Sequence, residues 1–146
     1  MVRVGVIGCG RIAQRRHVPE YASNKKVEIA GYYDAKMPRA QALADRYGGK
    51  VYKSIDEMLA DASIDAVSVC VANNVHAEIT VAALKAGKHV LCEKPMAMNL
   101  KECEDMVRAS KETGRFLMIG HNQRLAKAHA EARKLIESGL IGDIIT

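Results

Sequence analysis

Apolar residues in this chain gather into short, unbroken runs separated by longer amphipathic stretches. The runs predict six strands, at residues 2–7, 27–33, 50–53, 64–71, 89–92 and 116–119. Runs rich in Val and Ile without polar alternation are typical of parallel strands that are buried on both faces. We therefore expect these segments to form the interior of a parallel sheet.

The stretches between and after the runs carry helix signals. They predict helices at residues 11–16, 38–47, 54–60, 76–86, 99–113 and 126–138. Ser54 with Glu57 three residues later forms a capping box, Asn99 is a second N-cap, and Gly114 is a C-terminal stop. The first helix is expected to be interrupted near Pro19, because proline disfavours helical geometry in the residue before it.

Strands that alternate with helices imply right-handed crossovers between parallel neighbours. The predicted fold class is therefore α/β, with a doubly wound parallel sheet of the Rossmann type. We expect one domain over residues 1–120, because 146 residues suffice for a single ordinary core. Residues 121–146 hold one more helix and then an apolar stretch at 144–146 that predicts the start of a further strand.

The composition is that of an ordinary globular protein, with 49% apolar and 27% charged residues. The net charge of +5 comes from Lys and Arg spread along the chain, so no nucleic-acid partner is expected. No apolar run approaches membrane-spanning length, and no membrane association is expected. Four cysteines without Cys-x-x-Cys spacing favour a reduced, cytoplasmic setting. The histidines show no metal-ligand spacing, so no metal is expected.

The turn after the first strand reads Gly8-Cys9-Gly10-Arg11-Ile12-Ala13. A strand that ends in Gly-x-Gly-x-x-Ala and continues into a helix is the dinucleotide-binding form of the glycine-rich fingerprint. Gly8 permits a tight turn, Gly10 lets the backbone approach a pyrophosphate, and Ala13 lets the helix pack against the strand. The free N–H groups and the positive dipole end of the helix then supply an anion site.

Asp34 follows Gly10 by 24 positions, at the end of the second predicted strand. A carboxylate there accepts hydrogen bonds from adenosine ribose hydroxyls and repels a ribose 2′-phosphate, which favours NAD over NADP. Lys36 and Arg39 follow closely and could grip a phosphate, so NADP stays open. The alternative interpretation of Asp34 is an ordinary exposed acid in a turn.

Polar residues also follow the fourth, fifth and sixth predicted strands. They lie in the segments 72–76, 93–95 and 120–124. The carboxyl ends of parallel strands share one edge of the sheet, and ligands of open α/β sheets bind at that edge. We expect these three segments to meet at the site.

Taken together, these motifs resemble the glucose–fructose oxidoreductase, inositol dehydrogenase and rhizopine catabolism family, over essentially the whole chain. The most discriminating feature is Glu93-Lys94-Pro95 after the fifth strand; the others are the glycine turn, Asp34, Asn73-Asn74-Val75-His76 and Ile141-Gly142-Asp143-Ile144. Two positions depart from the family pattern. Asn74 stands where proline is frequent, and Gln123 stands where arginine is common.

The resemblance implies a catalytic role for Lys94, which would hydrogen-bond the substrate and assist proton transfer during hydride transfer. A lysine that is partly desolvated near a cationic nicotinamide ring has its charged form disfavoured, so acid–base behaviour is physically reasonable. The alternative is a surface lysine in a proline turn. In that family the bond before the proline is often cis.

The resemblance also implies a set of cofactor-binding residues along the carboxyl edge of the sheet. They are Gly8, Gly10, Arg11, Ile12, Asp34, Ala72, Asn73, His76, Glu93, Lys94 and Asn122. For His76, a residue that packs or caps the helix start is an equally open interpretation. The cofactor is expected to be NAD, with NADP as the alternative.

The implied function is an NAD(P)-dependent oxidoreductase that transfers hydride between nicotinamide and a sugar, an inositol or a related polyol. In the resembled family a C-terminal α/β domain supplies most of the substrate pocket and the homo-oligomer interface. That domain is absent from these 146 residues, so we expect the chain to be the cofactor-binding part and inactive alone. The alternative function is a non-catalytic dinucleotide-binding or sensing module.

Overall fold

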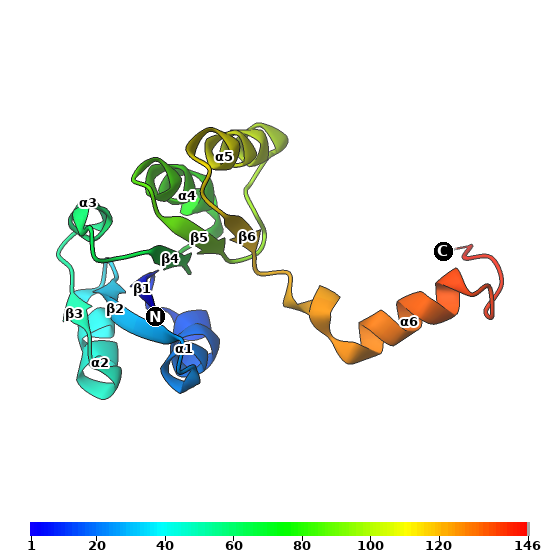
Figure 1. The fold of residues 1–146 in the computed structure, drawn as a ribbon, viewed down its shortest axis with the longest axis horizontal. Coiled ribbons are helices and arrows are strands. Elements are labelled where there is room, and N and C mark those ends of the chain that lie inside the picture. Colours follow the sequence, from blue (N-terminus) through cyan, green and yellow to red (C-terminus); the bar gives the residue numbers. More distant parts are fainter. Residues whose placement is uncertain (146) are drawn as a thin grey trace.

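A computed structural model describes residues 1–145 and contains a six-stranded, all-parallel sheet (Figure 1). The strand order is β3-β2-β1-β4-β5-β6. The strands are β1 (Val2–Ile7), β2 (Val27–Tyr33), β3 (Lys50–Val51), β4 (Ala66–Val69), β5 (His89–Cys92) and β6 (Leu117–Ile119). The order reverses between β1 and β4, which places a topological switch point at the carboxyl ends of these two strands. The predicted doubly wound parallel sheet is confirmed.

Helices cover both faces of the sheet. The segments η1 (Ala13–His17), α1 (Val18–Ser23) and α2 (Met37–Tyr47) lie on one face, and α3 (Ile55–Ala60), α4 (His76–Lys85) and α5 (Leu100–Thr113) lie on the other (Figure 1). The strands therefore bury both of their faces, as their continuous apolar runs indicate.

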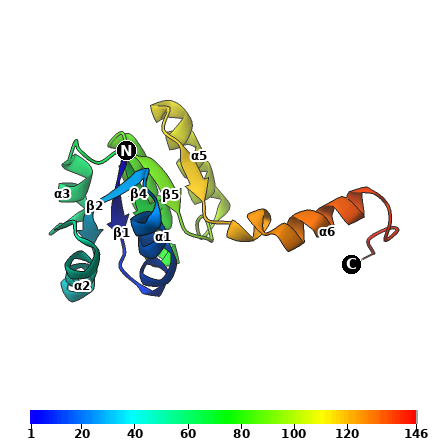
Figure 2. The ribbon, with the colours of Figure 1, turned by 60° about the horizontal axis from the view of Figure 1, so that its bottom comes forward.

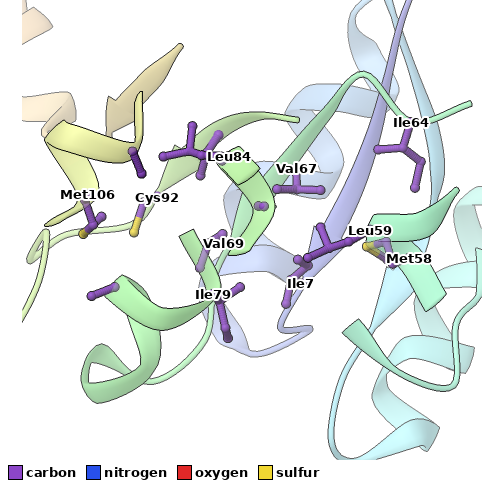
Figure 3. Packing of buried hydrophobic residues seen from close by; sticks show 14 of the residues in the cluster. Ile7, Met58, Leu59, Ile64, Val67, Val69, Ile79, Leu84, Cys92 and Met106 are labelled. Carbon is purple, nitrogen blue, oxygen red and sulfur yellow. The ribbon is translucent and has the colours of Figure 1, made fainter. Parts of the chain in front are cut away.

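Two hydrophobic clusters form the core, one on each face. Ile7 of β1, Val67 and Val69 of β4, Leu84 of α4 and Met106 of α5 belong to the larger cluster (Figure 3). The smaller cluster lies under η1, α1 and α2, and its members include Val6, Ala13, Val18, Tyr32 and Leu43. Because Val6 and Ile7 are consecutive and point to opposite clusters, β1 stabilises both layers at once.

The first helix departs from the prediction at Pro19. The backbone stays helical over residues 11–23, with the π turn η1 directly before the proline, so no interruption occurs. The Val18 N–H donates to the Ala13 carbonyl, five residues earlier. Pro19 has no N–H to place in this ladder and lies in the first turn of α1, where helices tolerate proline.

Other element boundaries moved by one to three residues. Strand β3 ends at Val51 and β4 covers only residues 66–69, so both are shorter than predicted. Ser54 does cap α3, accepting a hydrogen bond from the Glu57 N–H at 3.0 Å, and Asn99 caps α5 in the same way. Gly114 ends α5 with φ +66°.

The last helix, α6 (Lys127–Glu137), follows the short 3-10 turn η3 (Asn122–Leu125) and extends away from the sheet (Figures 1 and 2). Residues 143–145 form no strand, and Thr146 lies outside the described residues, so the predicted strand at 144–146 is wrong for its described part. No helix within residues 1–145 combines the length and the hydropathy needed to cross a bilayer.

Lys88 is a buried cation that joins the loop after α3 to the start of β5. Its side chain is 5% exposed, and Nζ donates to the carbonyls of Asp61 at 2.7 Å and Ile64 at 2.9 Å. The two carbonyls lie just before β4, and Lys88 lies just before β5, so the bonds tie together the segments that lead into these two strands. A hydrogen bond to a charged group is worth more than a neutral one.

We expect Lys88→Met to lower the free energy of unfolding by about 2 kcal/mol, because it leaves two carbonyls without their charged donor. Urea unfolding followed by circular dichroism measures this change. Lys85→Met, an exposed substitution on α4, is the matched control and should change stability by less than about 0.5 kcal/mol. Equal stability losses in the two variants would contradict the role assigned to Lys88.

Candidate functional site

Gly8 makes the turn after β1, where the backbone passes close to Cys70 after β4. Its φ is +92°, and a Cβ at this position would lie 2.6 Å from the Cys70 carbonyl oxygen. Its N–H donates to the Tyr33 carbonyl at 2.8 Å, which also ties the turn to β2. Only glycine satisfies both the backbone angle and the contact.

Gly10 faces open space. A Cβ placed there would meet no atom within 4 Å, whereas Ala13, one turn later, is fully buried against the sheet. Arg11 and Ile12 begin the helix between them and are exposed. The helix therefore starts with its N-terminal end at an unobstructed surface, as an anion site requires.

The Asp34 carboxylate is fixed beside this turn. Oδ2 accepts from the Cys9 N–H at 2.7 Å, and Oδ1 accepts from the Lys36 N–H at 2.7 Å. Each carboxylate oxygen keeps a further lone pair for another donor. The acid at the end of β2 is therefore held at the mouth of the glycine turn in a fixed orientation.

A cleft of about 560 Å³ opens over the carboxyl ends of β1, β2 and β4. Gly8, Gly10, Asp34 and Ala72, all predicted site residues, lie in its lining together with Arg39. The carboxylates of Asp34 and Glu78 and the Arg39 guanidinium thus border the same space. A dinucleotide fits this cradle, because the open face of Gly10 and the anchored acid occur in one concave surface.

A second, smaller cavity of about 210 Å³ lies on the other side of the glycine turn. Its lining includes the predicted residues Ile12, Glu93 and Asn122, together with His17 and His121. The cleft and this cavity share the carboxyl edge of the sheet and flank the segment 8–17. The structure thus distributes seven of the predicted residues over two neighbouring hollows, whereas Arg11, Asn73, His76 and Lys94 line neither.

The Glu93-Lys94-Pro95 turn follows β5, and the Lys94-Pro95 peptide bond is cis. Glu93 Oε1 lies 2.9 Å from His17 Nε2, and Glu93 Oε2 accepts from the Lys94 N–H at 3.1 Å. The Lys94 residue itself is exposed. The contacts of the Glu93 carboxylate therefore fix the backbone of an exposed lysine.

His76 lies behind the site and not in the lining of either hollow. It is fully buried, with Nδ1 2.8 Å from the Pro95 carbonyl and Nε2 3.2 Å from the Val71 carbonyl. It thus joins the end of β4 to the turn that carries Lys94. Asn73, in contrast, is exposed on the 3-10 turn η2 (Asn73–Val75).

His17 is a site residue that the sequence reasoning missed. It lies four positions after Ala13, on the face of the helix that packs against the sheet, and is 8% exposed. The sequence signal that could have identified it is a histidine on the helix face where apolar core residues are expected. Its partner Glu93 is 76 residues away, and only the fold brings the two together.

The cysteines near the site are unsuited to nucleophilic chemistry. Burial raises the pKa of the Cys9 and Cys70 thiols to about 12 and that of Cys92 to about 11. At neutral pH these thiols are therefore protonated, and the thiolate is the nucleophilic form. Within residues 1–145, no group of three or more His, Cys, Asp or Glu side chains is arranged to hold a metal ion.

Comparison with known proteins matches residues 2–121 to a family described as "Oxidoreductase family, NAD-binding Rossmann fold". The chain is 35% identical to a D-glucoside 3-dehydrogenase from Escherichia coli, covering 98% of this chain and 41% of that protein. It is 35% identical to a myo-inositol 2-dehydrogenase from Thermotoga maritima, covering 97% of this chain and 42% of that protein. The chain thus spans about two fifths of the length of these relatives.

Solved structures of similar enzymes also match nearly the whole chain and less than half of their own length. A 3-ketoreductase from Actinomadura kijaniata in complex with NADP and TDP-benzene superposes with a TM-score of 0.92 at 33% identity, covering 98% of this chain and 44% of the other. A putative myo-inositol dehydrogenase from Sinorhizobium meliloti superposes with a TM-score of 0.87 at 33% identity, covering 97% and 43%.

The two glycines of the turn should respond differently to an added methyl group. Gly8→Ala forces a β-carbon against the Cys70 carbonyl and should lower the free energy of unfolding by at least about 2 kcal/mol. Gly10→Ala meets no neighbour and should leave stability unchanged or raise it by up to about 1 kcal/mol. Urea unfolding of both variants checks the contrast, and a loss at Gly10 equal to that at Gly8 would contradict it.

Proposed function

The chain belongs to the glucose–fructose oxidoreductase, inositol dehydrogenase and rhizopine catabolism family of oxidoreductases, with an NAD-binding Rossmann fold, and from this premise we propose its function. It is the cofactor-binding part of an enzyme that transfers hydride between a nicotinamide and a sugar, an inositol or a related polyol. The dinucleotide-binding domain covers residues 1–120, and α6 lies outside its sheet.

One observation carries the cofactor proposal: the open face of Gly10 and the anchored Asp34 carboxylate border a single cleft of about 560 Å³. The helix N-terminus after Gly10 would hold the pyrophosphate through its N–H groups. Asp34 would accept hydrogen bonds from the adenosine ribose hydroxyls. Ile12, Glu93 and Asn122 border the neighbouring cavity and would contact the nicotinamide half.

The bound nicotinamide supplies the hydride donor or acceptor. Lys94 would hydrogen-bond the reacting substrate oxygen, donate a proton to it during reduction and accept one during oxidation. The residue is exposed at the carboxyl edge of the sheet, where a substrate can reach it. Arg11, Ala72 and Asn73 would complete the contacts to the cofactor, and His76 would support Pro95 from behind.

The substrate class rests on the relatives. Their names include a D-glucoside 3-dehydrogenase, a 1,5-anhydro-D-fructose reductase and a myo-inositol 2-dehydrogenase. All three names refer to polyhydroxylated compounds. We therefore assign this chain to an enzyme that reacts at a carbinol or carbonyl carbon of such a compound.

Cofactor choice should follow the charge beside the ribose. We expect this chain to bind NADH about tenfold more tightly than NADPH, because the fixed Asp34 carboxylate repels a 2′-phosphate. Asp34→Ser should reduce the difference, since Arg39 remains in the same cleft. Calorimetric titration with both cofactors measures the ratio. Equal or reversed affinities in the unmodified chain would overturn the assignment of Asp34.

The proposed role of Lys94 is tested in the full-length protein that carries this chain. Lys94→Ala should lower kcat by about 10²- to 10⁴-fold, the usual contribution of a positioned proton donor, and leave the Kd for NADH within about twofold. Steady-state kinetics on a panel of sugars and inositols gives the first value, and fluorescence titration gives the second. An unchanged kcat would remove Lys94 from the mechanism.

A further inference from the structure

The Glu93 carboxylate is nearly buried, and its strongest contact is with a histidine from another part of the chain. The side chains of Glu93 and His17 are 14% and 8% exposed, and Oε1 lies 2.9 Å from Nε2. A carboxylate only accepts, so Nε2 carries the proton and donates it. The first helix is thereby bonded to the turn that holds Lys94.

The other ring nitrogen of His17 is also occupied. Nδ1 lies 2.8 Å from Ser68 Oγ, and the Tyr21 hydroxyl donates to the same oxygen at 3.2 Å. With Nε2 protonated, Nδ1 accepts from the Ser68 hydroxyl. The hydrogen bonds then run in one direction, from the Tyr21 hydroxyl through Ser68 and His17 to the Glu93 carboxylate. Ser68 is fully buried in β4, so the tautomer and orientation of His17 are fixed from the core.

The position of Glu93 matters because Lys94 is its neighbour in sequence. Among residues 1–145, no carboxylate oxygen lies within 4.0 Å of the Lys94 ammonium nitrogen. A carboxylate at that distance would hold the ammonium proton electrostatically and hinder proton transfer. Arg16, which borders the small cavity together with Glu93, already pairs with Glu20 at 2.8 Å. The Lys94 N–H already donates to Glu93 Oε2, so Lys94 is the cation with which we expect a released Glu93 to pair.

We propose that His17 is a positioning residue that keeps the Glu93 carboxylate away from the Lys94 ammonium group, so that the lysine can exchange its proton. The inference rests on the proposed role of Lys94. It assigns a function to a buried pair that joins the first helix to the fifth strand. Without the His17 donor, the buried carboxylate loses its main partner and must find another.

Substitutions of His17 separate its two contacts. His17→Asn keeps a polar atom near the Nδ1 position, facing Ser68, and removes the donor that reaches Glu93. His17→Gln keeps a donor that reaches Glu93. His17→Asn combined with Glu93→Gln removes the negative charge from the released side chain. Tyr52→Phe deletes a partly buried 2.7 Å hydrogen bond to Asp61, on the other side of the sheet order from β5, and is the matched control.

The measurement is the rate at which an N-hydroxysuccinimide acetate reagent acetylates Lys94 in this chain, read by peptide mass spectrometry. The rate is divided by that of Lys25, an exposed lysine in the loop before β2 at the opposite edge of the sheet. Only the unprotonated amine reacts, so a salt bridge to Glu93 slows acetylation. Circular dichroism verifies that each variant folds, and His17→Ser replaces His17→Asn if the latter does not.

We expect His17→Asn to slow the acetylation of Lys94 about fivefold and the added Glu93→Gln to restore the rate to within twofold of the unmodified chain. His17→Gln and Tyr52→Phe should stay within twofold. A folded His17→Asn variant that reacts at the unmodified rate would overturn the proposal, and so would a double variant that stays slow. In that case His17 would have a structural role only and would not control the charge environment of Lys94.

Kinetics of the full-length protein provide a second measurement. His17→Asn should lower kcat about tenfold with the KM for NADH within twofold, and the double variant should recover most of the loss. Acetylation needs neither cofactor nor substrate, so it tests His17 even if the unmodified protein reduces no sugar. Absence of turnover in the unmodified protein contradicts the proposed function alone, whereas unchanged acetylation in His17→Asn contradicts the role of His17 alone.

Discussion

The turn after β1 passes over the end of β4 with no room for a side chain, and the geometry of the site follows from this contact. Two neighbouring strands hold the turn: β2 through the Gly8 N–H bond to Tyr33, and β4 through the backbone approach at Cys70. Asp34 then accepts from the Cys9 N–H and fixes the turn to the acid beside it. The helix that follows can only begin at the carboxyl edge of the sheet, with its N-terminal amides directed at the cleft.

The turn that carries Lys94 is fixed in a corresponding way by two buried imidazoles. His17 contacts Glu93 on one side of the lysine, and His76 contacts the Pro95 carbonyl on the other. One histidine belongs to the first helix and the other begins α4, and these helices lie on opposite faces of the sheet (Figure 1). An exposed lysine on a loop thus gains a defined position without any contact that would neutralise its charge.

The sequence predicted most of this arrangement, because the signals concerned are local. Apolar runs located all six strands, and caps at Ser54 and Asn99 located two helix starts. The glycine turn and Asp34 were each placed at the end of a strand, and the adjacency of β1 and β2 brings them together. The continuation of the helix through Pro19 was missed, because a π turn depends on how the helix packs. The pairing of His17 with Glu93 was missed because it joins residues 76 positions apart.

The π turn also decides which residues of the first helix reach the sheet. It closes a hydrogen bond between Ala13 and Val18, five positions apart, and so contains one residue more than an ordinary helical turn. In a regular helix five residues rotate the side chain by about 500°, which would direct Val18 about 140° away from Ala13. The wider turn keeps both residues on the face that packs against the sheet, where both are fully buried. The extra residue thus lets the helix bury two consecutive side chains, His17, which contacts Glu93, and Val18, which belongs to the core.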